Sequence, residues 1–234
     1  MTVSKPCILL DLNLMEYGRV WHLQHKLVDL RAQKRIPDAI ILVEHPAVIT
    51  LGRRGDRSQL IQRQYPVFEI ERGGQATYHG PGQLVSYPII NLADAECNVH
   101  EYVRRLEELL IRVLRDFNIE SGRAEGLPGV WTEGRKIASI GVAAKYWVTY
   151  HGFALNVNTD LSHFESIKPC GLGSEVMTSM QRILGANVDF EAVKRSVKVH
   201  FEEVFDRSLT PAPVDLRLVS EGSHVEGFAF SPSP

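Results

Sequence analysis

Only one of the three cysteines in this chain has the sequence surroundings of an accessible nucleophile. Cys170 lies between Pro169 and Gly171, in the glycine-bearing segment 168–173. Proline fixes the backbone before the sulfur, and glycine leaves little side-chain bulk after it. A thiol in this setting is a candidate for covalent catalysis once it is ionised. The alternative is the common structural role of free cysteine, a small buried hydrophobic residue.

The other two cysteines lack such surroundings. Cys7 lies in an apolar stretch and Cys97 just precedes an expected helix, so both are expected to be unreactive. An odd number of cysteines without a CxxC pair argues against a disulfide framework. The chain is therefore expected to work in a reducing cytoplasm.

Lys136 stands at the edge of the apolar run Gly134-Arg135-Lys136-Ile137-Ala138-Ser139-Ile140-Gly141. A lysine that loses part of its hydration can act as a base or as a fixed cation. The alternative is a surface lysine whose aliphatic stem lies along apolar neighbours. The residues alone leave both interpretations open.

Residues 72–83 form a glycine-dense segment with four glycines, Arg72-Gly73-Gly74-Gln75-Ala76-Thr77-Tyr78-His79-Gly80-Pro81-Gly82-Gln83. Glycine lets the backbone approach a ligand closely and exposes peptide N–H donors. The segment matches neither the GxGxxG nor the Walker pattern. Its alternative interpretation is a long hairpin connection.

Histidines are spread along the chain rather than clustered. His45, His79, His151 and His163 show no HExxH or zinc-ligand spacing, so a metal site is not expected. No GxSxG sequence is present that would indicate a serine hydrolase.

Hydrophobic periodicity predicts the elements that must position these residues. Strands are expected at residues 7–12, 39–44, 47–51, 67–71 and 84–91, with β character throughout 120–160. Helices are expected at 13–34, at 102–117 and from the N-cap residue Asp189 onward. Because strands and helices mix without strict alternation, the predicted fold is α+β, or mixed-sheet α/β, in a single domain at residues 1–208. A loosely packed tail is expected at 209–234.

Composition excludes several functional classes. The 234 residues include 26 Lys and Arg against 28 Asp and Glu, whereas nucleic-acid-binding proteins usually carry a marked basic excess. No apolar run reaches the roughly 18 residues that a transmembrane helix needs, and the N-terminus does not read as a signal peptide. Neither nucleic acid nor membrane is expected as a partner.

Taken together, these segments resemble one family, the octanoyl-[acyl-carrier-protein]:protein N-octanoyltransferases of lipoate biosynthesis. Five stretches carry the resemblance, in the family's order and spacing: ERGGQATYHGPGQLV (71–85), GLPGVW (126–131), GRKIASIGV (134–142), HGFALNVN (151–158) and PCGL (169–172). The resemblance covers roughly residues 8–205.

The resemblance implies a fold similar to the catalytic domain of biotin ligases and lipoate–protein ligases, with a mixed sheet flanked by helices. It implies that Cys170 accepts the acyl group as a thioester, and that Lys136 lowers the pKa of this thiol and can act as a base. It also implies an acyl pocket lined by Arg72, Gly73, Gly74, Gln75, Ala76, Thr77, Tyr78, His79, Ser139, Ile140, Gly141, Gly152, Phe153 and Ala154.

The implied reaction moves an octanoyl group from the phosphopantetheine of acyl carrier protein to a lysine ε-amino group. The acceptors would be lipoyl domains of 2-oxoacid dehydrogenase subunits and the glycine cleavage H protein. A thioester donor is already activated, so no ATP, metal or other cofactor is expected. Two alternatives are an ATP-dependent lipoate or biotin ligase, which needs no nucleophilic thiol, and a non-catalytic binding module, which needs neither Cys170 nor Lys136.

One basic segment falls outside the resemblance. Arg53, Arg54 and Arg57 lie in the expected loop 52–63, and the resemblance gives this loop no role. Acyl carrier proteins are acidic, so a basic rim would attract one through complementary charge. The alternative is a solvated loop without a partner.

Overall fold

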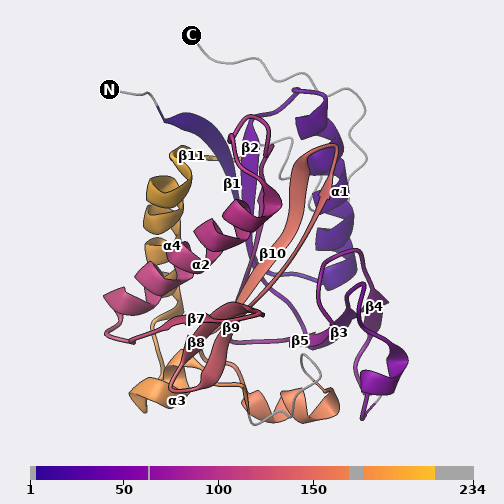
Figure 1. Ribbon diagram of the computed structural model, residues 1–234, viewed down its shortest axis with the longest axis vertical. Helices are drawn as coiled ribbons and strands as arrows, with labels where there is room; N and C mark the ends of the chain where they lie inside the picture. Colours follow the sequence, from indigo (N-terminus) through magenta and orange to yellow (C-terminus); the bar gives the residue numbers. More distant parts are fainter. Residues whose placement is uncertain (1–3, 63, 169–175, 214–234) are drawn as a thin grey trace.

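The computed structural model describes residues 4–62, 64–168 and 176–213, so Cys170 and most of the expected tail lie outside the described residues. Its main feature is an eight-stranded mixed sheet (Figure 1). The strands run in the order β11 (Arg207–Pro211), β1 (Lys5–Leu14), β2 (Asp38–Glu44), β6 (Gln83–Ile89), β10 (Val148–Asn156), β9 (Arg135–Lys145), β8 (Leu127–Thr132) and β7 (Gly122–Ala124). Strand β1 is parallel to β11 and β2, and the other pairs are antiparallel.

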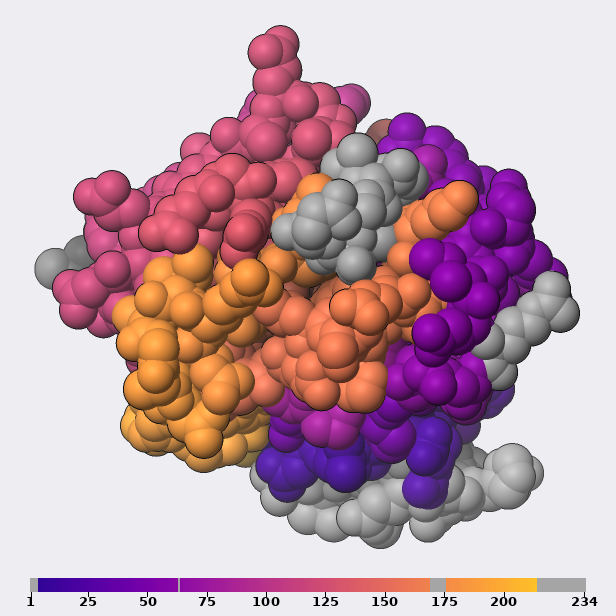
Figure 2. All heavy atoms as spheres, turned by 90° about the horizontal axis from the view of Figure 1, so that it is seen from below, coloured from indigo at the N-terminus to yellow at the C-terminus, as the bar shows by residue number. Residues whose placement is uncertain are grey.

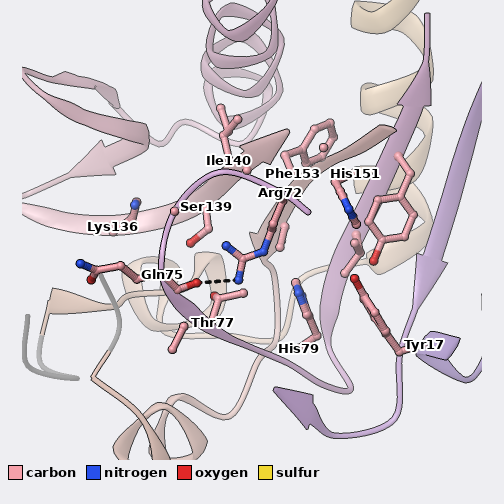
Figure 3. Close-up of a pocket in the computed structure, with 17 residues that line it drawn as sticks. Tyr17, Arg72, Gln75, Thr77, His79, Lys136, Ser139, Ile140, His151 and Phe153 are labelled. Atoms are coloured by element: carbon pink, nitrogen blue, oxygen red, sulfur yellow. Dashed lines mark hydrogen bonds between the residues drawn. The ribbon is translucent and has the colours of Figure 1, made fainter. Parts of the chain in front are cut away.

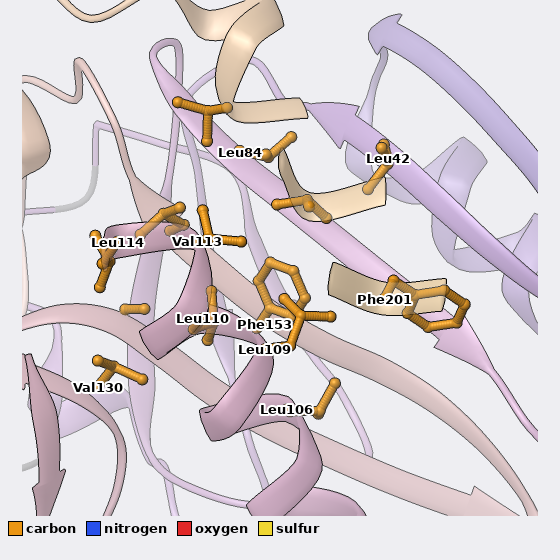
Figure 4. Packing of buried hydrophobic residues seen from close by; sticks show 14 of the residues in the cluster. Leu42, Leu84, Leu106, Leu109, Leu110, Val113, Leu114, Val130, Phe153 and Phe201 are labelled. Atoms are coloured by element: carbon orange, nitrogen blue, oxygen red, sulfur yellow. The ribbon is translucent and has the colours of Figure 1, made fainter. Parts of the chain in front are cut away.

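Helices cover both faces of this sheet (Figure 1). Helix α1 (Tyr17–Ala32) packs on one face, and α2 (Val99–Asp116) and α4 (Phe190–Phe205) pack on the other. Successive residues of a strand point to opposite faces, so Ile40 and Leu42 join the core under α2 and α4, while Ile41 and Val43 join the core under α1. Figure 4 shows Phe153 of the sheet beside Leu109 and Leu110 of α2.

Polar side chains fix where the long helices begin. The Asn98 side chain accepts a hydrogen bond from the Glu101 N–H at 3.0 Å, and the Glu101 carboxylate accepts one from the Asn98 N–H at 2.9 Å. Asp189 caps α4 as the sequence predicts, because its carboxylate accepts from the Ala192 N–H at 3.1 Å. Each cap stabilises its helix by about 1 kcal/mol. The short helix α3 (Met180–Leu184) is not predicted from the sequence.

A second, three-stranded sheet lies beside the first. Its order is β4 (Val67–Glu69), β3 (Val48–Leu51) and β5 (Ala76–His79). Strand β5 lies within the segment expected to be a continuous glycine-dense loop, and it pairs antiparallel with β3. Ala76 and Tyr78 are buried against Phe164 and Met177, and this tertiary contact explains the extra strand. The segment is therefore not a hairpin connection, since it joins the small sheet to β6 of the large sheet.

Several element boundaries differ from the predicted ranges, and two of the differences affect the architecture. Helix α1 begins at Tyr17 rather than near residue 13, because β1 continues to pair with β2 as far as Leu14, whose side chain is 59% exposed. At the other end, β11 pairs with β1 through Pro211, so the domain extends past residue 208. The structure of the tail beyond residue 213 stays a prediction. No described helix is long and apolar enough to cross a membrane.

Candidate active site

A pocket opens where the small sheet meets the middle of the large one (Figure 3). It holds about 530 Å³ of empty space, including the part that opens to solvent. Its wall comes from the glycine-dense segment and from strands β6, β9 and β10, with one residue of α1. The lining residues are Tyr17, Arg72, Gly74, Gln75, Ala76, Thr77, His79, Val85, Tyr87, Lys136, Ser139, Ile140, Gly141, His151, Gly152, Phe153 and Ala154.

This lining brings together most of the residues that the resemblance places around an acyl chain, although they come from distant parts of the sequence. Two expected residues lie outside it. The Gly73 N–H donates to the Val142 carbonyl at 2.9 Å, which fixes the segment against β9. Tyr78 points to the other side of β5, where its ring packs against those of Tyr65 and Phe164 at 5.5 Å each.

Arg72 holds the glycine-dense segment in place from within. Its guanidinium is buried and donates to the Thr50 carbonyl at 2.8 Å, to the Thr50 hydroxyl at 2.9 Å and to the Gln75 carbonyl at 2.8 Å, the last drawn in Figure 3. Gly141 leaves room for this arrangement, since a Cβ there would lie 2.9 Å from Arg72 Cδ. The arginine therefore shapes the pocket wall by charge-assisted hydrogen bonds to backbone oxygens.

Lys136 is buried, with 3% of its surface exposed, and lines one end of the pocket. Its Nζ lies 5.4 Å from the centre of the Trp131 ring, a cation–π distance. Its carbonyl accepts from the Thr178 N–H at 3.0 Å, and Lys136 forms a parallel bridge with Met177. The structure thus places the Lys136 side chain at the pocket and the chain at 177–178 beside the Lys136 backbone. The surface-lysine interpretation is excluded.

Gly129 makes room for the Lys136 side chain. It has a φ of +124°, and a Cβ there would lie 2.7 Å from Lys136 Cε and 2.4 Å from the Ala138 carbonyl oxygen. Both contacts are shorter than van der Waals distance. Only glycine fits this position without moving the lysine.

Two buried histidines near the pocket are neutral. Burial lowers the pKa of His79 to about 3 and that of His45 to about 4. His79 Nδ1 donates to Gln83 Oε1 at 2.8 Å. His45 Nδ1 donates to the Met15 carbonyl at 2.7 Å, so its Nε2 accepts from the Tyr87 hydroxyl at 2.8 Å. Neither ring can serve as a fixed cation at neutral pH.

His151 occupies an unusual backbone conformation. Its φ is +55°, in the left-handed region, which costs a non-glycine residue about 1–3 kcal/mol. The Gln24 side chain compensates by accepting from the His151 N–H at 2.8 Å. The ring approaches the Glu71 carboxylate, with Nε2 3.4 Å from Oε2, and this hydrogen bond is the main reason that the pKa of Glu71 falls to about 2. The pocket wall thus carries a histidine held in a strained position.

The other two thiols lie away from the pocket. Burial raises the pKa of Cys7 well above its ordinary value and also raises that of Cys97, which keeps both protonated. Cys170 itself is outside the described residues. Within the described part of the chain, no group of three or more histidine, cysteine, aspartate or glutamate side chains is arranged to hold a metal ion.

Four lining residues were not predicted: Tyr17, Val85, Tyr87 and His151. Tyr17 lies in the segment 13–34, which periodicity predicts to be a helix, and Tyr87 lies in the predicted strand 84–91. His151 opens one of the resembling stretches, HGFALNVN, which was a usable signal. Val85 ends another of these stretches, ERGGQATYHGPGQLV. Tyr17 and Tyr87 reach the pocket through tertiary packing, which local sequence does not encode.

Comparison with known proteins identifies the family. Residues 16–202 match the model of the lipoyl protein ligase A/B catalytic domain. The octanoyltransferase of Syntrophotalea carbinolica is 47% identical over 204 residues, which are 87% of this chain and 97% of that protein. The octanoyltransferase of Pelobacter propionicus is 42% identical, covering 88% of this chain and 98% of that protein.

Solved structures show the same fold at low sequence identity. A bipartite lipoate protein ligase from Thermoplasma acidophilum has a TM-score of 0.73 at 15% identity, covering 94% of this chain and 91% of that one. Lipoate-protein ligase A bound with ATP has a TM-score of 0.70 at 14% identity, covering 94% and 93%. Biotin protein ligase from Aquifex aeolicus is more distant, with a TM-score of 0.51 at 13% identity over 86% of this chain and 70% of that one.

The expected fold is therefore confirmed as that of the biotin and lipoate ligases. The match of the family model and the identity to octanoyltransferases over most of both chains settle the assignment. The chain belongs to the lipoyl protein ligase A/B catalytic-domain family and, within it, to the octanoyltransferases, which are acyltransferases that serve protein lipoylation.

Proposed function

We propose that this chain moves an octanoyl group from the phosphopantetheine of acyl carrier protein, through a thioester on Cys170, to a lysine of lipoyl domains. The acceptors are the lipoyl domains of 2-oxoacid dehydrogenase subunits and the glycine cleavage H protein. The observation that carries the proposal is the placement of Lys136. It lines the pocket and bridges to Met177, seven positions after Cys170 in the chain.

The first step exchanges one thioester for another. The Cys170 thiolate attacks the donor carbonyl, the new C–S bond forms, and the C–S bond to phosphopantetheine breaks. The departing phosphopantetheine thiolate takes a proton from the Lys136 ammonium and leaves with the carrier as a thiol, so Lys136 is neutral for the next step. A thiol of ordinary pKa, about 8.5, is mostly protonated at neutral pH, so a nearby ammonium increases the reactive fraction. The Lys136 ammonium supplies that charge in this proposal.

The second step forms the amide. The acceptor ε-amino nitrogen attacks the acyl-Cys170 carbonyl, the C–S bond breaks, and the thiolate is restored. The proton that the amine loses goes to Lys136 in its neutral form. The Gly73 N–H is already donated to Val142, so we assign the oxyanion to other backbone donors near the pocket.

The pocket favours an acyl chain because much of its wall is apolar. Ile140, Phe153 and Ala154 of the central strands contribute side chains to it. Each methylene removed from water contributes about 0.8 kcal/mol, roughly fourfold in binding. Burial of the acyl chain against apolar side chains therefore provides octanoyl recognition, and Lys136 at one end of the pocket takes part in catalysis.

A direct assay separates this reaction from that of an ATP-dependent ligase. Octanoyl-carrier protein and a lipoyl domain are incubated with the enzyme without ATP, and the mass of the lipoyl domain is measured. We expect a gain of one octanoyl group. Transfer that requires free octanoate and ATP would instead support a ligase, and no transfer with either donor would support a binding module.

Substitution of Gly129 tests the placement of Lys136. Gly129→Ala should lower kcat/KM for octanoyl transfer at least about tenfold, because the new Cβ would lie 2.7 Å from Lys136 Cε and 2.4 Å from the Ala138 carbonyl oxygen and so displaces the lysine stem and the strand that carries it. The matched control is Gly126→Ala, which also has a positive φ, of +71°, but nothing within 4 Å of the new Cβ. Kinetics and Tm are measured for both. Equal kcat/KM in the two variants would show that the room Gly129 leaves for the Lys136 side chain is not needed for transfer.

We assign the docking of the acidic carrier protein to a basic rim formed by the exposed side chains of Arg53 and Arg54. Backbone N–H groups of Arg53 and Arg54 donate to the carbonyls of Arg72 and Gly74 at 2.9 and 3.0 Å, so this loop is fixed beside the pocket wall while both side chains are exposed. Arg57 pairs with Glu69 instead, at 2.9 Å. Figure 2 shows this part of the chain, in purple, against the orange segment that precedes residue 169. Leu60 of the purple part and Ile167 of the orange segment form an antiparallel bridge.

Charge reversal at Arg53 and Arg54 should raise the KM for octanoyl-carrier protein about fivefold to tenfold at low salt, and less at 0.3 M salt. The KM for the lipoyl domain should change less than twofold. The control is Arg195→Glu on α4, an exposed arginine on the opposite face of the sheet. Equal changes for both substrates, or none, would refute the docking role.

A further inference from the structure

A row of buried, hydrogen-bonded polar groups connects two sides of the pocket. Its members, in order, are Arg72, Thr50, His79, Gln83, Asn156, Thr178 and the backbone of Lys136. No member is more than 8% exposed, and Arg72, His79 and Lys136 line the pocket (Figure 3). Polar groups buried this deeply stay only where each finds a hydrogen-bond partner, so the row is a built feature of the fold.

Backbone carbonyls fix the direction of the hydrogen bonds nearest to the lysine, because a carbonyl oxygen only accepts. Gln83 Nε2 faces the Tyr78 carbonyl at 3.2 Å, so this nitrogen also donates to Asn156 Oδ1 at 2.9 Å. Asn156 Nδ2 then donates to the Thr178 carbonyl at 2.9 Å. The Thr178 N–H donates in turn to the Lys136 carbonyl at 3.0 Å. The Asn156 side chain thus holds the segment that pairs with Lys136.

The hydrogen bonds farther from the lysine have the same direction. Burial keeps the His79 ring neutral, with a pKa of about 3, and its Nδ1 donates to Gln83 Oε1 at 2.8 Å. The other ring nitrogen, Nε2, therefore accepts from the Thr50 hydroxyl at 3.4 Å, and the Thr50 oxygen accepts from Arg72 Nη2 at 2.9 Å. Each group donates toward Lys136, and hydrogen bonds aligned in this way strengthen one another.

Asn156 lies where the sheet changes its pairing. Strand β10 ends at this residue, and its pairing with β9 ends one residue earlier, at Leu155. Farther along β9, Lys136 forms its parallel bridge with Met177 instead. The Asn156 carboxamide spans this junction, because it extends from the end of β10 to Thr178, the residue after Met177.

We propose that Asn156 and Gln83 are positioning residues for octanoyl transfer, which hold the Thr178 backbone against that of Lys136 and so fix where the lysine side chain enters the pocket. Neither residue lines the pocket, so both act on the reaction through Lys136. This inference rests on the function proposed above, in which Lys136 tunes the thiol of Cys170. Loss of the Asn156 hydrogen bonds should therefore change the chemical steps more than the binding of the donor.

Asn156→Ala removes the donor to Thr178 and the acceptor for Gln83. We expect kcat for octanoyl transfer to fall about tenfold to a hundredfold, since a displacement of about 1 Å at a catalytic group has an effect of that size. The pKa for alkylation of Cys170 should rise by about half a unit or more. The KM for octanoyl-carrier protein should change less than about threefold. Exchange of the Thr178 amide hydrogen, followed by NMR, should become at least about tenfold faster.

Asn158→Ala is the matched control. Asn158 also fixes a backbone segment, because it accepts from the Val188 N–H and donates to the Val188 carbonyl, at 2.9 Å each. It is not a member of the row that ends at Lys136. The control variant should also lose stability, measured as Tm, because it too loses two hydrogen bonds. Its kcat should stay within about twofold of the wild-type value, and its Thr178 exchange should be unchanged.

Gln83→Met supplies the test if Asn156→Ala does not fold. The substitution keeps an unbranched side chain of similar length and removes the hydrogen bond to Asn156 Oδ1. Because the Asn156 carboxamide then loses one of its two partners, kcat should fall about threefold to tenfold and Thr178 exchange should again become faster.

The same kcat in the Asn156→Ala and Asn158→Ala variants, or Thr178 exchange that Asn156→Ala leaves unchanged, would overturn the proposal. Absence of octanoyl transfer by the wild-type enzyme would instead contradict the proposed reaction. The exchange measurement does not depend on turnover and still shows whether Asn156 holds Thr178, so the two failures are distinguishable.

Discussion

Replacement of Cys170 by alanine is expected to lower octanoyl transfer about 10³-fold or more, the largest effect of any single substitution in this chain. The substitution removes the atom that we propose carries the acyl group, and the remaining site retains only positioning and charge. Steady-state kcat with octanoyl-carrier protein and a lipoyl domain is the measurement. Because Cys170→Ala removes one sulfur atom, the expected change in stability is small beside the change in rate.

Cys97→Ala is the matched control for the loss of a thiol. Cys97 is half-buried, lies outside the pocket lining, and has a pKa raised by burial, so its removal should leave kcat within about twofold. Comparable losses in both variants would indicate a structural effect. Substantial transfer by Cys170→Ala would mean that the acyl group passes directly from donor to amine.

Replacement of Lys136 has the second largest expected effect. Lys136→Ala should reduce transfer about 10²-fold to 10⁴-fold, because it removes both roles that we propose for this lysine: the charge that favours the thiolate and the base that accepts the amine proton. Lys136→Arg should retain part of the first role and lose the second, since guanidinium stays protonated. Formation of the acyl-enzyme should therefore survive better than its aminolysis in the arginine variant.

Two measurements resolve these roles. The pH dependence of alkylation of Cys170 by iodoacetamide reports the pKa of the thiol, which should rise by about one unit or more in Lys136→Ala and less in Lys136→Arg. Single-turnover experiments report the two chemical steps separately. An alkylation pKa that is unchanged in Lys136→Ala would show that the lysine does not tune the thiol. His79 could not replace it as the cation, because burial keeps that ring neutral with a pKa of about 3.

The sequence predicts the parts of this site that depend on local pattern. Arg72, Lys136 and Gly152 lie in stretches whose residue order is itself distinctive, and the structure brings all three to one pocket. The long amphipathic helix α2 and the Asp189 cap of α4 follow from periodicity and side-chain chemistry in the same way. The mixed sheet follows from strands and helices that mix without strict alternation, together with the family resemblance.

Long-range packing accounts for what the sequence does not predict. Strand β5 forms because Ala76 and Tyr78 find apolar partners about 90 to 100 residues further along the chain, at Phe164 and Met177. Tyr17 reaches the pocket because β1 runs on to Leu14 and places the start of α1 over the small sheet, against Phe68.

The central claim is that the octanoyl group passes through Cys170. Enzyme is mixed with octanoyl-carrier protein without an acceptor, analysed by intact mass spectrometry and peptide mapping, and then chased with a lipoyl domain in a rapid-quench instrument. We expect one octanoyl group per chain, labile to hydroxylamine, mapped to the peptide that contains Cys170, and transferred to the lipoyl domain at least as fast as kcat. An adduct on Cys7, Cys97 or Lys136 alone, or one that is chased more slowly than turnover, would contradict the claim.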